Sequence, residues 1–510
     1  MRAAVLVLLF VACDTAPPVE SWSSERLADT TVGVGVDARD TFEDLGDTSD
    51  VPGPDSQLAD DSLEDRDSRD SSESDTALSD VPDTTDTTDT SATGDTTDTP
   101  DTAGPGDTAG PGDTAGPGDT DTSPEPLGTV DDPIAITRFP WVRDLDTRAA
   151  SSDHLDRYDC STADESGPEL VHRFEVTNPG ELVVEVAETS GVDVDLHLLD
   201  RAPPATASSA VPCVARANTR LTRQVTPGEY WLVVDTFVSS GSAKSGPFKL
   251  AVELTVLDAW QVVELAPGLT WRKKVYANYA GGRQTINVLE VAPSLAGPFL
   301  RPYLKRGGGC IRPSRIGSEQ GAIAAMNAGF FDTGPGTCPP LDLVKADGEV
   351  LSYNRLTGSA QRSIGWTADR ETLVAWIDKD RDWPAVVDGL GAYPSLVTSG
   401  AIRLEPDRDT DFFDGRHPRT ALGVKADGTV LLVVVDGRTS AGVGMTLTAL
   451  AQHMIHLGAV DAVNLDGGGS TSLWLRDQSI NGVVNHPSDN GTADHFGERA
   501  VGDVLLVFAP

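Results

Sequence analysis

Four polar clusters in the second half of the chain contain the residue types that enzymes use for acid–base and anion chemistry. They read MNAGFFD at 326–332, RHPRTALG at 416–423, VVDGR at 434–438 together with NLDGGGST at 464–471, and NHPSDNGTADHFGERAVG at 485–502. Carboxylates can act as acids, bases or nucleophiles, and a guanidinium fork can bind two oxygens of one anion. Each cluster lies at the end of an apolar run or in the loop after it, where a rigid scaffold commonly presents catalytic groups. We therefore expect these loops to carry the chemistry of the protein.

Periodicity and turn residues predict the elements that position these clusters. Residues 420–438 predict a hairpin, because two apolar runs flank the turn Ala426-Asp427-Gly428. A helix is expected between Thr446, which can cap it, and Gly458, which can end it. Residues 461–475, DAVNLDGGGSTSLWL, predict a strand, a glycine turn and a second strand. Strands interleaved with helices and hairpins indicate an α+β (mixed α/β) core for residues 259–510.

A different pattern precedes this part. Five short runs rich in Val, Leu and aromatic residues alternate as strands do: HRFEVTN, ELVVEVAET, DVDLHLLD, GEYWLVVDTFV and GPFKLAVELTV. They predict an antiparallel β-sandwich in residues 133–258. The order of its features resembles the bacterial pre-peptidase C-terminal domain, which implies an accessory module of a secreted enzyme. Asp193, Asp195 and Asp200 could ligate calcium, although the same spacing fits a solvated strand face.

The N-terminal quarter is strongly acidic. The chain has 39 basic and 79 acidic side chains, and residues 14–132 alone hold 33 acidic and 4 basic ones. This segment repeats DTAGPG and DTT and cannot bury enough apolar surface to offset the entropy of ordering, so we expect residues 13–132 to be a disordered tether. An acidic chain without a basic cluster is not expected to bind nucleic acid. The absence of an apolar run of about 18 residues excludes a polytopic membrane protein.

Residues 1–12 read as a signal peptide, with Arg2 followed by a short apolar run. The ending FVAC resembles the bacterial lipoprotein signal, so lipidation of Cys13 is expected, with a plain signal peptide as the alternative. The protein would then be exported and lipid-anchored to a bacterial membrane or cell surface. The four remaining cysteines are even in number, and the simplest disulfides join Cys160 with Cys213 and Cys310 with Cys338. Two other connectivities stay open.

The C-terminal motifs carry a specific resemblance. NAGFF, GAYPSLVTSG, HPRTALG, VVDGR, GMTL, NLDGGGST and GERAVG occur in this order between residues 327 and 502. Their order and spacing resemble the phosphodiester glycosidase family over nearly all of residues 259–510. The resemblance implies a hydrolase that cleaves the glycosidic bond of a sugar-1-phosphodiester, with an N-acetylglucosamine-like sugar. Its partner would be a cell-surface or extracellular glycan or glycolipid.

The candidate residues follow from that chemistry. Cleavage requires an oxocarbenium-like centre to be stabilised while a phosphate monoester departs, tasks that suit carboxylates and arginines. The candidate catalytic residues are Asp466, Glu498 and Asp436. The candidates for binding substrate or phosphate are Asn327, Arg419, Arg438, Asn464, Gly467, Gly468 and Arg499. No metal is required by this set, and calcium is possible.

Each candidate also has a plainer interpretation. Asp436-Gly437 and Asp466-Gly467 are turn dipeptides, in which an Asp often bonds only its own backbone. The triple glycine can form an anion-binding nest or merely a hairpin, Asn327 can simply close a strand, and Arg499 can form a surface ion pair with Glu498. Two other functions remain open for the whole chain. One is a surface carbohydrate-binding protein without catalysis, and the other is a phosphodiesterase that cuts the P–O bond.

Overall fold

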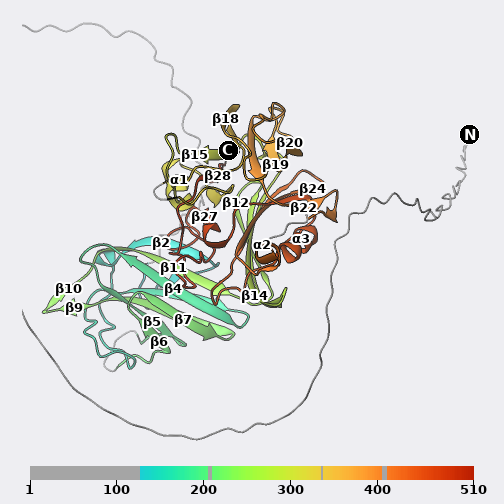
Figure 1. Ribbon diagram of the computed structural model, residues 1–510. Coiled ribbons are helices and arrows are strands. Elements are labelled where there is room, and N and C mark those ends of the chain that lie inside the picture. The colour runs from blue at the N-terminus through green and yellow to red at the C-terminus, as the bar shows by residue number, and fades with distance from the viewer. Residues whose placement is uncertain (1–126, 205–209, 335–336, 405–409, 510) are drawn as a thin grey trace, which may run out of the picture. The chain divides into compact units, whose positions relative to one another are not determined.

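The structure is a computed structural model that describes residues 127–204, 210–334, 337–404 and 410–509 (Figure 1). The predicted signal peptide, Cys13 and the tether up to residue 126 lie outside these ranges. Within the described ranges, no helix is long and apolar enough to cross a membrane.

Residues 134–255 form two main sheets that share a hydrophobic core, and a short hairpin of β9 (Val238–Ser239) and β10 (Ser242–Ala243). The five-stranded sheet has the order β1 (Ile134–Ala135), β3 (Leu170–Val176), β8 (Gly228–Thr236), β5 (Val194–Leu199), β6 (Ala215–Ala217). The four-stranded sheet has the order β2 (Trp141–Asp146), β11 (Pro247–Thr255), β4 (Gly180–Glu188), β7 (Arg220–Val225). Leu196 and Leu232 of the first sheet share one buried cluster with Leu182 and Leu250 of the second. All five predicted runs form strands, and the expected sandwich of two sheets is present; only β1 and β3 pair in parallel among its strands.

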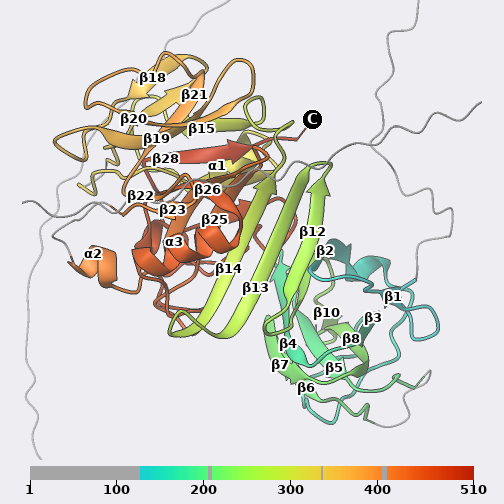
Figure 2. The same ribbon diagram turned by 90° about the vertical axis from the view of Figure 1, so that its right-hand side faces the viewer.

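The rest of the chain is built around an eight-stranded antiparallel sheet. Its order is β12 (Trp260–Ala266), β13 (Leu269–Tyr279), β14 (Gly282–Val291), β25 (Val430–Val435), β24 (Arg419–Lys425), β26 (Ala459–Asn464), β22 (Ser395–Thr398), β23 (Ala401–Ile402). The predicted hairpin is β24 and β25, paired in register from Arg419 with Val435 to Val424 with Val430. The predicted helix is α3 (Leu447–His456), and the Thr446 side chain accepts a hydrogen bond from Ala449 N at 3.1 Å. In Figure 2, α3 lies against this sheet.

Two smaller sheets complete this part. One has the order β15 (Leu300–Leu304), β28 (Asp503–Val507), β16 (Ala324–Asn327), β27 (Leu473–Leu475). The other has the order β18 (Glu349–Ser352), β17 (Val344–Ala346), β21 (Asp388–Ala392), β19 (Gln361–Trp366), β20 (Thr372–Ile377). The remaining described α-helices, α1 (Pro313–Glu319) and α2 (Thr410–Asp414), are short. The structure thus corrects the expected α+β class: this part is β-rich, because its apolar runs pair as strands and only the run after Thr446 folds as a helix of ten residues.

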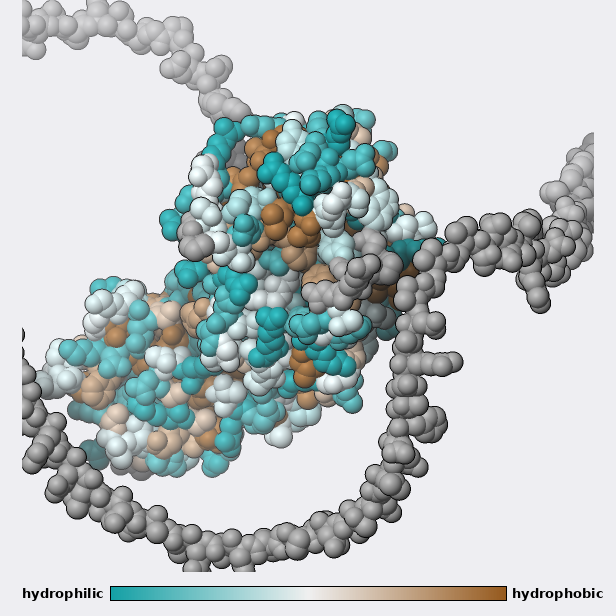
Figure 3. Space-filling view, viewed as in Figure 1, coloured by the Kyte–Doolittle hydropathy of each residue, from teal (hydrophilic) through white to brown (hydrophobic). Residues whose placement is uncertain are grey.

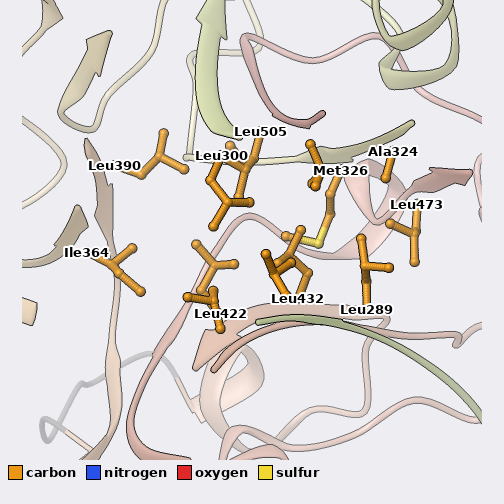
Figure 4. Packing of buried hydrophobic residues seen from close by; sticks show 14 of the residues in the cluster. Leu289, Leu300, Ala324, Met326, Ile364, Leu390, Leu422, Leu432, Leu473 and Leu505 are labelled. Carbon is orange, nitrogen blue, oxygen red and sulfur yellow. The ribbon is translucent and has the colours of Figure 1, made fainter. Parts of the chain in front are cut away.

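The core lies on both faces of the eight-stranded sheet. One face packs against α3 through Leu447, Leu450, Ala451 and Met454. Figure 4 shows side chains of the opposite face meeting the four-stranded sheet, with Leu289, Leu422 and Leu432 on one side and Leu300, Met326 and Leu505 on the other. On the surface seen in Figure 3, hydrophobic residues form small groups among hydrophilic ones. The sheets therefore provide a rigid scaffold, and the polar clusters lie where their strands end.

Candidate active site

The end of β16 is hydrogen-bonded to the residues that flank Gly467–Gly469, here called the glycine loop, which follows β26. Asn327, the last residue of β16, donates from Nδ2 to the carbonyl oxygen of Asp466 at 2.7 Å, and Asp466 N donates to Ala328 O at 3.0 Å. The Oδ1 atom of Asn327 accepts from Thr420 Oγ1 at 3.0 Å and from Ser472 N at 3.1 Å. Asn327 is fully buried. Its side chain therefore fixes the backbone on both sides of the glycines.

Asp466 follows β26 and remains partly exposed. Burial of its carboxyl group raises its pKa to about 6, although Ser470, the Gly467 backbone and the charge of Arg499 oppose this shift. A carboxyl group with a pKa close to neutral can both accept and release a proton at physiological pH. Asp466 is thus the candidate carboxylate whose protonation is best suited to catalysis.

Two guanidinium groups flank the glycines that follow Asp466. Gly468 has φ +60°, and a Cβ there would lie 3.1 Å from Nη1 of Arg438. A Cβ on Gly469 would lie 2.3 Å from Nη2 of Arg499 and 2.0 Å from Oδ1 of Asp489. A side chain at 469 would have to displace Arg499 and Asp489, because their polar ends occupy the space of its Cβ.

The two arginines are held differently. Arg499 donates from Nε and Nη2 to both carboxylate oxygens of Asp489, at 2.7 and 2.5 Å. Arg438 is exposed, and its Nη2 lies 2.9 Å from Nδ1 of His417. A guanidinium group has five N–H donors, of which these contacts use two in Arg499 and one in Arg438, and the remaining donors suit a phosphate group.

Asp436 lies at the end of β25 and is fully buried. Its Oδ1 accepts from His486 N at 3.0 Å, and its Oδ2 lies 2.7 Å from His486 Nδ1. Because the carboxylate is the acceptor, Nδ1 of His486 carries the proton. Burial lowers the pKa of His486, against the attraction of Asp436. The carboxylate of Asp436 therefore orients a histidine.

The structure places three other candidates in supporting positions. Glu498 accepts from Ser314 N at 2.9 Å, from the Ser314 hydroxyl and from Ser472 Oγ at 3.0 Å, so it joins the start of α1 to the segment after the glycines. Burial raises the pKa of Glu498. Arg419 is buried and donates to three backbone carbonyls, those of Met445, Phe412 and Gly415. Asn464 donates to the carbonyls of Tyr393 and Leu465, each at 2.8 Å.

Two buried aspartates beside this site were not among the sequence candidates. Asp503 Oδ2 accepts from Gly329 N at 3.1 Å, and Asp342 accepts from Phe330 N at 2.6 Å and from Gln361 Nε2 at 2.7 Å. Burial raises the pKa of Asp342 to about 7 and that of Asp503 to about 8. Both lie in apolar runs, LDLV and GDVLLV, where a lone acid is unusual. A single acidic residue within an apolar run was therefore the sequence signal that could have identified Asp342 and Asp503 as candidates.

Two of the three sandwich aspartates that could ligate calcium pair with arginine side chains instead. Asp195 pairs with Arg216 at 2.8 Å, and Asp200 pairs with Arg201 at 2.9 Å. Among the described residues, the cluster with metal-ligand geometry is Cys160, His197 and Cys213, whose two cysteines form a disulfide. The second predicted disulfide, Cys310–Cys338, is also present and closes a loop that contains β16 and Asn327. The two expected pairings are thus confirmed.

Comparisons with known proteins find relatives for the C-terminal part of the chain. Residues 320–508 match the phosphodiester glycosidase family. The mouse N-acetylglucosamine-1-phosphodiester alpha-N-acetylglucosaminidase is 27% identical over 229 residues, which cover 40% of this chain and 42% of the mouse protein. The human enzyme is 27% identical over 230 residues, again 40% of this chain and 42% of the relative. The chain therefore spans about two fifths of the length of these relatives.

A solved structure of the zebrafish N-acetylglucosamine-1-phosphodiester alpha-N-acetylglucosaminidase catalytic domain, auto-inhibited by its pro-peptide, aligns with a TM-score of 0.40. It shares 22% identity and covers 50% of this chain and 89% of that one. Residues 320–508 are therefore similar to the phosphodiester glycosidase family and to these enzymes. The glycine loop, both flanking arginines and the Asp436–His486 pair all lie within this range.

Proposed function

We propose that this protein is a hydrolase that cleaves the glycosidic bond of a sugar-1-phosphodiester, with an N-acetylglucosamine-like sugar. The observation that carries the proposal is the glycine loop, where Asp466 has a pKa of about 6 and the guanidinium groups of Arg438 and Arg499 lie beside the next glycines. The family match over residues 320–508 supports the same reaction.

The loop supplies the groups that this reaction needs. Water attacks the anomeric carbon, the C1–O bond breaks, and the phosphate monoester leaves with the bonding electrons. Asp466 takes the proton of the attacking water, while Arg438 and Arg499 stabilise the charge that develops on the phosphate. Phosphate is a good leaving group, so electrostatic stabilisation replaces much of the general acid catalysis that an ordinary glycosidase needs.

The other candidates hold this arrangement in place. Asn327, Arg419 and Asn464 fix the backbones of the loops through the hydrogen bonds described above. Glu498 secures Ser472 just after the glycines, and Asp436 orients His486. Rigid support of this kind is what keeps catalytic groups within a productive geometry.

We further propose that the protein is exported, attached to a bacterial membrane through a lipid on Cys13, and acts on a glycan or glycolipid at the cell surface. Two disulfides support an oxidising compartment. The acidic segment would then be the tether between lipid and enzyme, and the sandwich a pre-peptidase-like accessory domain.

The test incubates the full chain with the methyl diester of N-acetylglucosamine-1-phosphate and, separately, with an aryl glycoside. We expect free sugar from the diester only. Asp466→Asn should lower kcat/KM by about 10²- to 10⁴-fold. The matched control is Asp427→Asn, because Asp427 also precedes a glycine in a turn but lies on the exposed hairpin of β24 and β25.

The pH dependence provides a second readout. Asp466 must be ionised to accept a proton, so kcat/KM should fall as the pH drops below about 6. Sugar phosphate as the product would instead establish cleavage of the P–O bond. Binding of the diester without turnover at any pH would favour the carbohydrate-binding alternative.

A further inference from the structure

The segment 485–499, here called the arginine loop, carries several of the site residues. His486 at its start binds Asp436, and Asp489 and Arg499 pair beside Gly469. The loop contains no helix or strand. Its position therefore depends on contacts made by its side chains and carbonyl groups.

Two of those contacts are made by strands of the β-sandwich. His495 Nε2 lies 3.2 Å from Oε1 of Glu253 in β11, and Arg220 of β7 donates from Nη2 to Ala493 O at 3.4 Å. The other oxygen of Glu253 accepts from Lys273 Nζ of β13 at 3.1 Å. Glu253 thus joins the sandwich both to the arginine loop and to the eight-stranded sheet.

The protonation state of His495 follows from its two neighbours. Its Nδ1 lies 2.9 Å from Asn485 O and its Nε2 faces the Glu253 carboxylate, so both ring nitrogens meet acceptors. An imidazole can donate from both nitrogens only as the cation. His495 is only 2% exposed. Its hydrogen bond to the carbonyl oxygen of Asn485 joins this buried cation to the first residue of the arginine loop.

The charged groups around His495 favour the cation. Burial opposes it, but Glu253 and Glu185 outweigh burial and the repulsion of Lys273, so the pKa of His495 is raised. Arg220 is paired with Glu185 at 2.6 Å. His486 stacks on His495 with ring centroids 4.9 Å apart, and the cationic ring helps to lower the pKa of His486. The sandwich residues Glu253 and Glu185 thus favour the charge on His495, and that charge in turn affects the protonation of His486, which Asp436 orients.

We propose that the β-sandwich is a working part of the catalytic unit, in which Glu253 is a positioning residue that fixes the arginine loop through His495. This inference rests on the proposed function for its consequence, because the loop delivers Arg499 to the phosphate. A cavity of about 210 Å³ lies at the same junction, lined by Arg220, Glu253, Lys273, His486 and His495 among others. An apolar contact of Val142 and Ala251 with Ile480 also joins the two parts. The sandwich is therefore not expected to be removable without loss of activity.

The experiment compares Glu253→Gln with wild type in the full chain. The amide keeps an acceptor but removes the charge, so His495 should lose its proton at a lower pH. We expect KM for the diester to rise about tenfold at pH 8, with kcat changed much less, and the defect to shrink as the pH is lowered, because a lower pH favours the His495 cation. Amide hydrogen exchange in 485–499 should quicken about tenfold at pH 8.

Two further variants make the result specific. Lys249→Gln is the matched control, because Lys249 of β11 also reaches across to this part of the chain, at 3.9 Å from Asp477, but contacts no residue of the arginine loop. It should match wild type in both readouts. Arg220→Gln should speed exchange around Ala493, which tests the same anchoring if Glu253→Gln fails to fold.

Unchanged exchange and an unchanged pH profile in Glu253→Gln would overturn the inference, even if the wild type hydrolyses the diester. A wild type that does not turn over the diester would instead refute the proposed function. The exchange measurement would then still decide whether Glu253 positions the loop, because it does not depend on catalysis.

Discussion

Asp503 offers the sharpest test of the electrostatics beneath the site. Its carboxyl group is fully buried, accepts one backbone hydrogen bond from Gly329, and has a pKa raised by burial from 3.8 to about 8. Between these two values the folded protein holds a proton that the unfolded chain has lost. The free energy of unfolding must then fall as the pH rises from about 4 to about 8.

Replacing Asp503 with Asn removes this penalty while keeping the acceptor for Gly329. Each pH unit corresponds to about 1.4 kcal/mol, so the variant should gain about 4 kcal/mol relative to wild type between pH 5 and pH 8. The folded protein can rearrange around an ionised Asp503, which makes the gain in stability smaller than about 4 kcal/mol. A gain of about 2 kcal/mol would still be detected.

Urea unfolding of both proteins at intervals from pH 5 to pH 8.5, followed by tryptophan fluorescence, measures the difference directly. Asp427→Asn on the exposed hairpin is the control and should follow the wild-type curve. Parallel curves for Asp503→Asn and wild type would refute the reasoning, because Asp503 would then be ionised in the folded state at an ordinary pKa. Asp342, a second buried carboxyl group beside the site, would then also be expected to be ionised in the folded state.

Two other outcomes are expected. Gly469→Ala places a methyl group 2.3 Å from Nη2 of Arg499, so it should displace Arg499 from Asp489 and lower kcat/KM about 10- to 100-fold. Gly358→Ala is the control, because its added methyl group would meet no atom within 4 Å, and it should leave kcat/KM near wild type. Equal activity of both variants in a diester assay would contradict the close approach of Arg499 and Asp489 to Gly469. Cys310→Ala with Cys338→Ala opens a loop of sequence separation 28 and should cost about 3 kcal/mol of stability in a denaturant titration, whereas an unchanged midpoint would show that the disulfide does not constrain the unfolded chain.

Local elements of this protein could be predicted because their signals lie within a few residues. The turn at Ala426–Gly428 joins β24 and β25, and Thr446 caps α3 as its side-chain chemistry implies. The helical share was overestimated. Apolar runs that alternate with turns can belong to helices or to buried strands, and only pairing with distant strands, such as β14 with β25, decides between them.

The residue types of the site were also evident from sequence, since Asp466, Arg438, Arg499 and Asp436 were selected by their motifs. Their partners were not. Glu498 contacts Ser314, which is 184 residues away in the sequence, and Arg220 contacts Ala493, which is 273 residues away. Contacts between such distant residues produce no periodic pattern in the sequence. The structure also added Asp342 and Asp503, which the motifs did not include.

The sequence by itself therefore determined which groups can act and which short elements carry them, because propensity, capping and turn preference are local properties. Tertiary structure decided that Asp466 stays partly exposed with a pKa near neutral, that Glu498 holds loops in place through hydrogen bonds, and that His495 is charged. Those properties depend on burial and on neighbours far away in the chain, and they arise only when β16, β26 and the arginine loop come together in space.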